Sequence, residues 1–493
     1  MQQWWPVQWS QLLLPLLLLV AVAHTARAAP NAKPTKAAQL NNNNCQRERF
    51  WQQQPDQATT CPPDILPLRG TVYLLYDVNI SEGFNLRRDV YIRLAVFVRR
   101  LQRRTKRFRN VRLVLPPWPR LYHWHSQGLA QSDLLWRHFF DVESLRRFAP
   151  VLDFDEFVTE YRQFGMPSSP HVHVSQVFRL THYEIMLEQG VFRDKYERAT
   201  DAPEACLNAK SISGGPLLQQ PLLRHARYHC VRFQGSAGLL ERLLREAIHE
   251  DTVGVADAHD MRVYAVLSAE TLLHDNWGDE HFWLARRSMR FAAPLDQVAD
   301  DFRRSSLATT TASAGVQRPV MWELERQKRD ASGGNYLCAH LRRGDFVRSR
   351  ESTTPTLKAA AQQLKQLLRA CNMTTVFLAS DATPYELLEL KELFYRYRFV
   401  HFTPESSAQR QQLKDGGVAI VDQLVCSYAR HFVGTYESTF TYRIYEEREI
   451  LGFSKASTFN TFCKALGGNC ARNAIWPIVW PDEDDDVDDD KLN

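Results

Sequence analysis

Short apolar runs alternate with amphipathic stretches along most of this chain, as they do where strands alternate with helices. Residues 71–78 form an apolar run, residues 83–104 place apolar side chains at helical spacing, and residues 111–115 form a second apolar run. A strand, a helix and a further strand in this order make a β-α-β unit. The first half of the chain therefore predicts a parallel sheet.

The second half repeats this alternation. Strands are expected at residues 336–341, 375–379, 398–402 and 431–434. Helices are expected at about residues 355–370, from residue 384 onward, at 416–429 and at 438–451. A stretch rich in Ser, Thr, Ala and Gly at residues 304–334 indicates an inserted loop. The pattern predicts an α/β chain with two Rossmann-like domains that face a cleft.

Composition and charge narrow the class of protein and indicate how the chain is divided into segments. Of the residues, 44% are hydrophobic and 24% are charged, and the net charge of +5 gives no reason to expect a nucleic-acid partner. The basic cluster at 99–109 continues a helical pattern and indicates a solvated helix end, with a patch for an acidic partner as the alternative. We expect five segments: signal peptide 1–28, mobile segment 29–65, N-terminal domain 66–255, C-terminal domain 256–478 and disordered acidic tail 479–493.

The N-terminus predicts export. Residues 11–23 are apolar but too short to span a bilayer comfortably, and Ala26-Arg27-Ala28 follows as a small-x-small cleavage site. A retained anchor is the alternative, because the usual positive charges before the apolar run are missing. We expect a chain that is soluble in the secretory pathway after signal cleavage, with no stable membrane insertion.

This compartment permits disulfides, and the chain has nine cysteines. Local pairing predicts the bridges Cys45–Cys61, Cys206–Cys230 and Cys463–Cys470. Three cysteines in apolar runs are expected to be buried free thiols: Cys338, Cys371 and Cys426. Asn79 and Asn372 begin N-glycosylation sequons.

The most informative chemical signal is a positive charge at the end of a buried strand. The apolar run ends in His340-Leu341-Arg342-Arg343, and Asp345 follows. Burying Arg342 is costly unless an anion meets it, and ligands bind at the carboxyl ends of parallel strands. A guanidinium group suits a phosphate or diphosphate. A salt bridge between Arg342 and Asp345 that merely closes the loop is the alternative.

A second candidate follows the first predicted strand, where Ser81-Glu82-Gly83-Phe84-Asn85 opens a helix. Gly83 lets the backbone approach a ligand, and the free N–H groups of a helix start bind phosphate or sugar hydroxyls. Beside such a ligand, Glu82 has the chemistry of a general base. Alternatively, Glu82 only interacts favourably with the helix dipole.

Two further segments carry polar groups of the same kind. Ser438 and Thr439 begin a predicted helix, where hydroxyl and N–H groups converge on an anion. Asp422 ends an apolar run, and its carboxylate can accept two hydrogen bonds from a guanine edge. An ordinary helix cap is the alternative for both segments.

Metal ligands are scarce in the pattern. Asp153-Phe154-Asp155 has the Asp-x-Asp spacing of a metal site, but no other ligand candidates are near it, and we interpret it as a surface turn. The motifs His123-Trp124-His125 and His171-Val172-His173 favour packing or solvent contact over zinc binding. The sequence therefore predicts no metal.

Together these segments resemble the GDP-fucose protein O-fucosyltransferases over about residues 70–475, and especially the members that act on thrombospondin type 1 repeats. The matching motifs follow the family's order: Tyr76-Asp77-Val78, Glu82 to Asp89, His340 to Arg343 with Asp345-Phe346, Lys414 to Ile420, Ser438 to Phe440 and Glu446 to Gly452. The resemblance implies a GT-B fold, an inverting peptide-O-fucosyltransferase, GDP-fucose as co-substrate, and neither cofactor nor metal. It also implies the endoplasmic-reticulum lumen and folded, disulfide-bonded repeats as acceptors.

The resemblance also implies a role for each candidate residue. Glu82 would deprotonate the acceptor Ser or Thr hydroxyl, and Arg342 would neutralise the leaving β-phosphate. Glu447 would support them and is counted with the catalytic residues. The other residues expected to bind GDP-fucose are Ser81, Gly83, Phe84, Asn85, His340, Leu341, Asp345, Asp422 at the guanine, Ser438, Thr439 and Phe440.

Two other functions remain open at this point. The acceptor could be an epidermal-growth-factor-like repeat, a glycan or another molecule. A catalytically silent, lectin-like quality-control factor that binds folded repeats is an alternative of another class. Intact Glu82 and Arg342 argue against the silent factor.

Overall fold

The computed structural model describes residues 70–164, 169–182, 187–188, 191–192, 200–201, 217, 220–232, 235–252, 261–467, 470, 475 and 478–480. The expected signal peptide and mobile segment lie outside these residues, as do Cys45, Cys61, Cys206 and the acidic tail from residue 481 onward. Among the described residues, no helix has the length and apolar character needed to cross a membrane.

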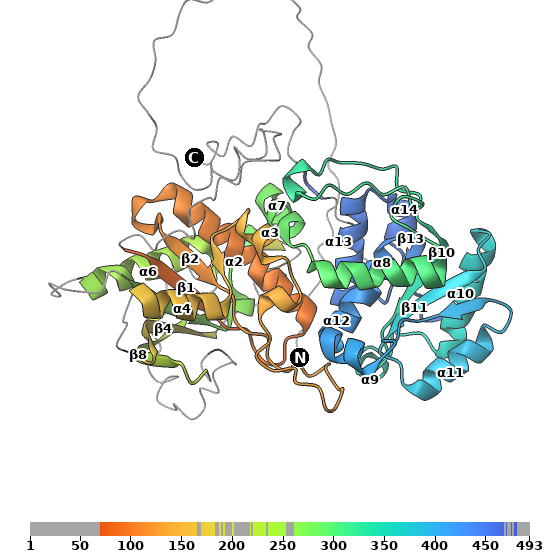
Figure 1. Ribbon diagram of the computed structural model, residues 1–493, viewed down its shortest axis with the longest axis horizontal. Coiled ribbons are helices and arrows are strands. Elements are labelled where there is room, and N and C mark those ends of the chain that lie inside the picture. Colours follow the sequence, from red (N-terminus) through yellow and green to blue (C-terminus); the bar gives the residue numbers. More distant parts are fainter. Residues whose placement is uncertain are drawn as a thin grey trace, which may run out of the picture. The chain divides into compact units, whose positions relative to one another are not determined.

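The first sheet has seven strands in the order β3-β2-β1-β9-β4-β8-β7. Figure 1 labels β1, β2, β4 and β8 among them. Its strands are β1 (Val72–Tyr76), β2 (Val111–Val114), β3 (Val151–Leu152), β4 (Val172–His182), β7 (Thr200–Asp201), β8 (Leu223–Arg232) and β9 (Arg262–Leu267). Neighbouring strands are parallel except for β7 and β8 at one edge. A separate antiparallel pair joins β5 (Leu187–Glu188) and β6 (Val191–Phe192).

Helices cover both faces of this sheet. The helices of this half are α2 (Phe84–Arg104), α3 (Val142–Arg146), α4 (Phe154–Phe164), α6 (Ala237–Thr252) and α7 (Glu280–Ser288). Alternate residues of β1 point to opposite faces: Leu74 packs in the core that contains α2 and α7, whereas Tyr73 lies 5.0 Å from the ring of Phe157 in α4. This two-sided burial explains why the strand is apolar throughout.

The second sheet has four parallel strands in the order β12-β11-β10-β13. They are β10 (Gly334–Leu341), β11 (Thr375–Ser380), β12 (Arg398–Val400) and β13 (Ala429–Val433). The helices are α8 (Ala293–Leu307), α9 (Phe346–Ser349), α10 (Leu357–Ala370), α11 (Pro384–Leu393), α12 (Ser407–Ser427), α13 (Thr439–Leu451) and α14 (Lys455–Thr458). Helix α11 starts with a capping box between Thr383 and Glu386, and α12 bends at Lys414, where φ is 58°.

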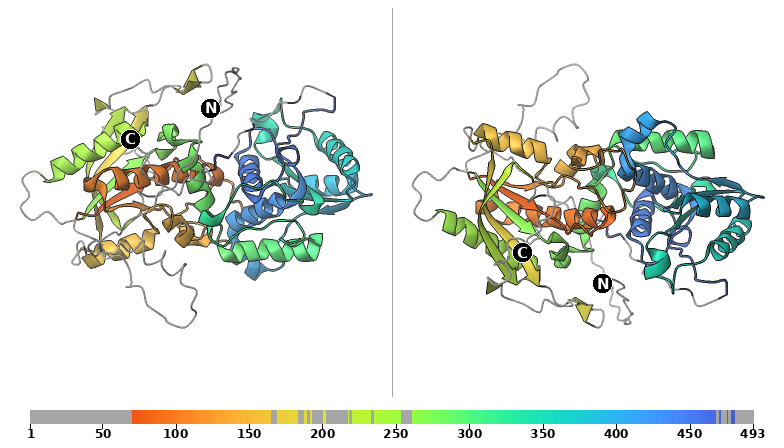
Figure 2. Two further views of the ribbon diagram at one scale, coloured as in Figure 1. Left: turned by 90° about the horizontal axis from the view of Figure 1, so that it is seen from above. Right: turned by 90° about the horizontal axis from the view of Figure 1, so that it is seen from below.

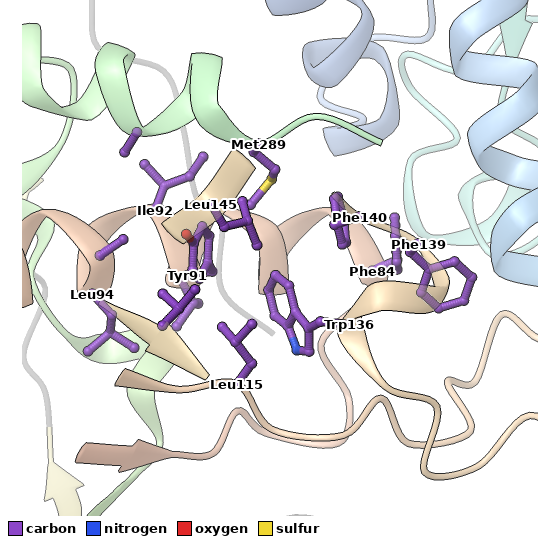
Figure 3. Packing of buried hydrophobic residues seen from close by; sticks show 14 of the residues in the cluster. Phe84, Tyr91, Ile92, Leu94, Leu115, Trp136, Phe139, Phe140, Leu145 and Met289 are labelled. Carbon is purple, nitrogen blue, oxygen red and sulfur yellow. The ribbon is translucent and has the colours of Figure 1, made fainter. Parts of the chain in front are cut away.

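A continuous apolar core joins the two sheets. It includes Leu74 from the first sheet and Cys338 from the second. In Figure 3, Phe84 at the start of α2 lies beside Phe139 and Phe140, and Tyr91 and Trp136 pack further along the helix. In both views of Figure 2, the orange to yellow-green segments gather around one sheet and the teal to blue segments around the other. The described residues accordingly belong to one compact unit by their contacts.

The position of β9 bears on where the two halves of the chain divide. This strand pairs with both β1 and β4, so a division at residues 255/256 removes one strand from the first sheet. Helix α7 packs against α2, whereas the next helix, α8, packs against α12. We propose that the two halves of the chain divide between α7 and α8.

The stretch at residues 304–334 is not simply an inserted loop. Residues up to Leu307 complete α8, and Ala314 and Val316 pack in a small core with Leu451 and Phe453. Arg318 extends from this stretch to the carboxylate of Glu447. The polar composition hid these contacts, because only a few residues of the segment are buried.

The cysteines confirm some expectations and correct others. Cys463–Cys470 is a disulfide, as predicted, and Cys371 is free, although it is only partly buried and not buried as expected. The prediction of free thiols at Cys338 and Cys426 is wrong, because they form a disulfide with Cα atoms 5.2 Å apart. Cys338 does pack in the strand, fully buried, but its side chain faces α12, where Cys426 lies. The pairs Cys45–Cys61 and Cys206–Cys230 involve residues outside the described part of the chain.

Candidate active site

The loop between β1 and α2 is held in place by a buried arginine. The guanidinium group of Arg87 donates hydrogen bonds to the carbonyls of Val78 at 3.2 Å, Asn79 at 2.8 Å and Glu82 at 3.0 Å. With these three hydrogen bonds, and with the backbone N–H of Glu82 donating to the carbonyl of Asn79 at 3.0 Å, the path of the loop that carries Glu82 is fixed. The exposed Asn79 turns its amide oxygen toward the backbone N–H and hydroxyl of Ser81, at 3.0 and 2.9 Å.

Glu82 has the environment of a general base. Its side chain is half-buried, and no hydrogen bond to its carboxylate is present among the described residues. Burial raises its pKa above the ordinary value, the nearby Glu270 raises it further, and Arg87 partly opposes both effects. A carboxylate with a raised pKa is a stronger base than an exposed carboxylate. This suits the abstraction of a proton from a hydroxyl group.

The first residues of α2 bring this loop against a histidine. Phe84 anchors the helix start in the core, with its ring 4.6 Å from that of Trp118. A Cβ atom on Gly83 would lie 3.2 Å from Nε2 of His123, so a larger residue would crowd the imidazole. Asn85 directs its side-chain oxygen toward Gln423 of α12 and Arg88 of its own helix.

His123 was not recognised as a site residue from the sequence. Its Nδ1 atom lies 3.2 Å from Nη2 of Arg342, so the imidazole lies between the start of α2 and the end of β10. Burial, and next the charge of Arg342, lower the pKa of His123 to about 4, so the ring is neutral near pH 7. Its only signal in the sequence was its place after β2, because loops at the carboxyl ends of parallel strands meet at one edge of the sheet.

Arg342 is surrounded by polar groups from several segments. It forms ion pairs with Asp345 and with Asp381, which follows β11, and it lies over the ring of Phe346 at 5.6 Å. The alternative of a loop-closing salt bridge is therefore part of the structure. It does not account for the contact with His123, which comes from the other half of the chain. Asp381 was also missed from the sequence.

The residues after β13 pack closely against His340. The ring of Phe440 stacks on that of His340 at 4.3 Å, and Nδ1 of His340 lies 2.7 Å from the hydroxyl of Thr441. Burial, and next Arg342, lower the pKa of His340 to about 3. A Cβ atom on Gly434 would collide with the side chain of Thr441, so only glycine allows this approach of β13 to α13.

Thr435 connects the ends of β10 and β13. Its hydroxyl donates to the carbonyl of His340 at 2.9 Å and accepts from the backbone N–H of Arg342 at 2.8 Å. The side chain of Leu341, between His340 and Arg342 in the sequence, is fully buried. Leu341 therefore contributes the position of its backbone to the site, and not a side chain. The buried Ser438 is the N-cap of α13, and no side-chain hydrogen bond caps the N–H groups that follow. These free N–H groups and Arg342 are suited to a diphosphate.

Asp422 lies inside α12, so it does not cap a helix. One of its carboxylate oxygens is buried and has no hydrogen-bond partner among the described residues. Burial raises its pKa well above the ordinary value. An unpartnered buried oxygen is costly, and N–H donors from a ligand would satisfy it.

Glu447 lies two turns into α13, away from the polar end of the helix. Its carboxylate pairs with Arg286 at 2.9 Å and with Arg318, while Glu446 pairs with Arg286 at 2.7 Å. Arg318 and Arg286 lower the pKa of Glu447 to about 2, against the opposing effect of burial. The structure brings Glu82, Gly83, His123 and Arg342 together, but it gives Glu447 no contact with them.

The Asp-x-Asp motif does not form a surface turn. Asp153 is fully buried and accepts hydrogen bonds from the backbone N–H groups of Trp136 and Arg137, each at 3.1 Å. Asp155 pairs with the side chain of Arg137. Both carboxylates therefore stabilise the loop before α3, and within the described ranges no group of three or more potential ligands could hold a metal.

Comparison with known proteins places this geometry in a family. The family model described as GDP-fucose protein O-fucosyltransferase matches residues 73–451. A Drosophila melanogaster protein named GDP-fucose protein O-fucosyltransferase 2 is 70% identical over 486 residues, which cover 98% of each chain. The human protein of that name is 36% identical over 411 residues, covering 83% of this chain and 90% of the human one.

A solved structure supports the fold. A crystal structure of POFUT1 in complex with GDP-fucose superposes with a TM-score of 0.51 and 15% identity, covering 80% of this chain and 99% of that chain. The predicted GT-B fold and the predicted enzyme class are confirmed. The chain belongs to the GDP-fucose protein O-fucosyltransferase family.

Proposed function

We propose that this protein transfers fucose from GDP-fucose to Ser or Thr hydroxyls of folded thrombospondin type 1 repeats, with inversion and without a metal. One observation carries the proposal. The Glu82 loop and Arg342 are separated by a single imidazole, because His123 lies against Gly83 on one side and 3.2 Å from Arg342 on the other. A carboxylate and a guanidinium group at this spacing suit opposite sides of one sugar carbon.

The reaction divides between these two groups. Glu82 takes the proton of the acceptor hydroxyl as its oxygen forms a bond to C1 of fucose. The bond from C1 to the β-phosphate oxygen breaks, and GDP leaves with the electron pair. Arg342 and the free N–H groups at the start of α13 stabilise the developing charge. Since attack and departure occur on opposite faces, the product has the inverted configuration.

Other residues bind the donor in this proposal. Gly83 and Asn85 contact fucose and the diphosphate, His340 and Phe440 line the nucleotide pocket, and Asp422 accepts from guanine. The predicted GDP-fucose site is completed by Ser81, Phe84, Leu341, Asp345, Ser438 and Thr439. Glu447 positions α13 through its arginine pairs. The endoplasmic-reticulum lumen, where disulfide-bonded repeats fold, remains the proposed compartment.

A transfer assay with different acceptors tests this function. The protein is incubated with GDP-fucose and, separately, a folded thrombospondin type 1 repeat, the same repeat reduced and alkylated, and a folded epidermal-growth-factor-like repeat. We expect product only with the first, equal rates with and without EDTA, and an inverted anomeric centre by NMR. Transfer to the epidermal-growth-factor-like repeat alone would support the alternative acceptor, and binding without turnover would support a silent quality-control factor.

A further inference from the structure

A buried arginine without an acidic partner lies behind the proposed donor site. Arg88, in the second turn of α2, is 1% exposed, and no ion pair to it occurs within the part of the chain that the structure describes. Two of its contacts are apolar or soft: Nε points to Sδ of Met289 at 3.5 Å, and the guanidinium group lies 4.9 Å from the ring of Phe291. Burial, and next the charges of Arg286 and Arg443, lower the pKa of Arg88 well below its ordinary value, and Glu446 and Glu447 oppose this only in part. A charge buried in this way is costly, so its few hydrogen bonds matter.

Those hydrogen bonds go to two side-chain amides. Nη1 of Arg88 donates to the amide oxygen of Gln423 at 3.0 Å and to that of Asn85 at 3.3 Å. Nε2 of Gln423 donates to the same Asn85 oxygen at 2.9 Å. A guanidinium group can only donate, so each amide must turn its oxygen toward Arg88. Gln423 is then left with its NH₂ group facing Asn85, which fixes the Asn85 oxygen a second time.

This arrangement determines what Asn85 offers to a ligand. With its oxygen held by two donors, the Nδ2 group of Asn85 points away from Arg88 and Gln423. It makes no hydrogen bond to the described residues, and it is not one of their buried, unpartnered atoms, so solvent reaches it. Asn85 follows Glu82 by three residues in the loop and helix start that face Arg342 through His123. The accessible group there is a hydrogen-bond donor.

The contact also joins the two halves of the chain. Asn85 and Arg88 belong to α2, which covers the first sheet, whereas Gln423 belongs to α12, which packs beside the second. The orientation of the Asn85 amide therefore depends on a residue from the half that carries Arg342 and α13.

We propose that Arg88 and Gln423 are positioning residues that hold the Asn85 amide with its NH₂ group toward the donor, where it hydrogen-bonds an oxygen of the sugar diphosphate. The inference rests on the proposed function, because it takes GDP-fucose as the ligand. It adds that donor recognition depends on the contact between α2 and α12, and it assigns to Gln423 an effect that passes entirely through Asn85.

The isosteric variant Gln423→Glu tests this directly. The new carboxylate pairs with Arg88 and keeps the shape of the side chain, but it cannot donate to Asn85. The Asn85 oxygen lies 2.9 Å from residue 423 and 3.3 Å from Arg88, so repulsion by the new carboxylate outweighs the hydrogen bond from Arg88. We therefore expect the Asn85 amide to turn over and to present its oxygen to the ligand. We expect an unchanged or raised thermal unfolding temperature, with kcat/KM for GDP-fucose about 10- to 100-fold lower, the cost of one hydrogen bond to a charged group.

A double-variant comparison separates this mechanism from a general structural effect. In an Asn85→Ala background, Gln423→Glu should change kcat/KM and the Kd for GDP-fucose by less than about twofold, because there is no amide left to turn. Gln412→Glu, an exposed change on the same helix, is the matched control and should behave as wild type. Gln423→Met lacks both the amide donor and the negative charge. With Asn85 intact, its loss of kcat/KM should lie between those of Gln412→Glu and Gln423→Glu.

Two results would overturn the inference. One is wild-type kinetics for Gln423→Glu, and the other is the same loss with and without Asn85. If Gln423→Glu does not fold, Gln423→Met in both backgrounds decides by the same comparison. Failure of the proposed function is distinguishable, since it appears in the wild-type protein as GDP-fucose binding without transfer to any repeat, while the GDP-fucose Kd still reports on the Asn85 amide.

Discussion

Nδ1 of His123 lies 3.2 Å from Nη2 of Arg342, and these two residues come from opposite halves of the chain. Because the guanidinium group only donates, Nδ1 of His123 accepts, and the proton of the neutral imidazole is on Nε2, which faces Gly83. The histidine thus connects the loop of the proposed base with the proposed leaving-group residue. Protonation of the His123 ring would remove the acceptor at Nδ1 and with it the hydrogen bond from Arg342.

The first prediction concerns acid. The pKa of His123 is about 4 in the folded protein, below its ordinary 6.5, so the neutral form contributes stability above pH 6.5 that is lost as the pH falls toward 4. His123→Asn keeps an acceptor but does not titrate. We expect thermal unfolding scans between pH 7 and pH 4 to show a smaller acid-induced decrease for this variant. His125→Asn, exposed in the same loop, is the control and should follow wild type, and an identical decrease for all three proteins would contradict the prediction.

Arg342 is expected to act on the leaving group. Arg342→Ala should abolish transfer and weaken GDP binding, measured by calorimetry. Arg342→Lys should restore little of either, because a point charge cannot replace a guanidinium group that contacts Asp345, Asp381 and His123 together. Arg348→Ala changes an exposed arginine on α9 and should be neutral. Full transfer by Arg342→Lys, or a requirement for manganese after EDTA treatment, would reject the arginine-centred mechanism.

Glu447 is expected to act through stability. Glu447→Gln leaves Arg286 and Arg318 under-paired in the core, which typically costs about 3–5 kcal/mol of unfolding free energy. Since its folded pKa is about 2, below the ordinary 4.5, the stabilisation is present above pH 4.5 and is lost as the pH falls toward 2. Glu389→Gln, on the surface of α11, should have no effect on denaturant unfolding. Loss of transfer at unchanged stability would instead show that Glu447 touches the reacting groups.

The disulfide between β10 and α12 should stabilise the second sheet. Cys338 and Cys426 are 88 residues apart, so opening this bridge by Cys338→Ala with Cys426→Ala should cost about 2–5 kcal/mol of unfolding free energy. Peptide mapping without reduction should recover Cys338–Cys426, and Cys371 should be alkylated under denaturing conditions. Cys371→Ser is the control. Alkylation of Cys338 in the unreduced protein would contradict the bridge.

Elements with strong apolar runs or clear caps could be predicted from the sequence to within a few residues. The strand expected at 336–341 is β10 (Gly334–Leu341), and the helix expected at 438–451 is α13 (Thr439–Leu451). Both are surrounded by protein, so their patterns are unambiguous. The stretch before β10 was misjudged because its polar residues hide a few buried ones, such as Val316.

Contacts between distant segments could not be predicted in the same way. His123 and Arg342 are 219 residues apart, and only the fold brings their two loops together. Cys338 and Cys426 each lie in an apolar run, where a buried thiol and a buried disulfide have the same pattern. Asp153 resembles a metal ligand in sequence, yet its carboxylate accepts hydrogen bonds from backbone N–H groups and from the side chain of Arg137. Residue types and their spacing in the sequence predicted the candidate site, whereas the contacts among its residues could be identified only from the structure.

The most direct test of the account separates donor binding from transfer in Glu82→Ala. Because the proposed base acts on the acceptor hydroxyl, GDP-fucose affinity should stay within about twofold of wild type, while transfer to a folded thrombospondin type 1 repeat falls by about 10²- to 10⁴-fold. Asn372→Gln, which removes an exposed sequon far along the chain, serves as the control for protein quality. Unchanged transfer by Glu82→Ala, or a loss of transfer matched by an equal loss of GDP-fucose binding, would contradict the assignment of Glu82 as the base.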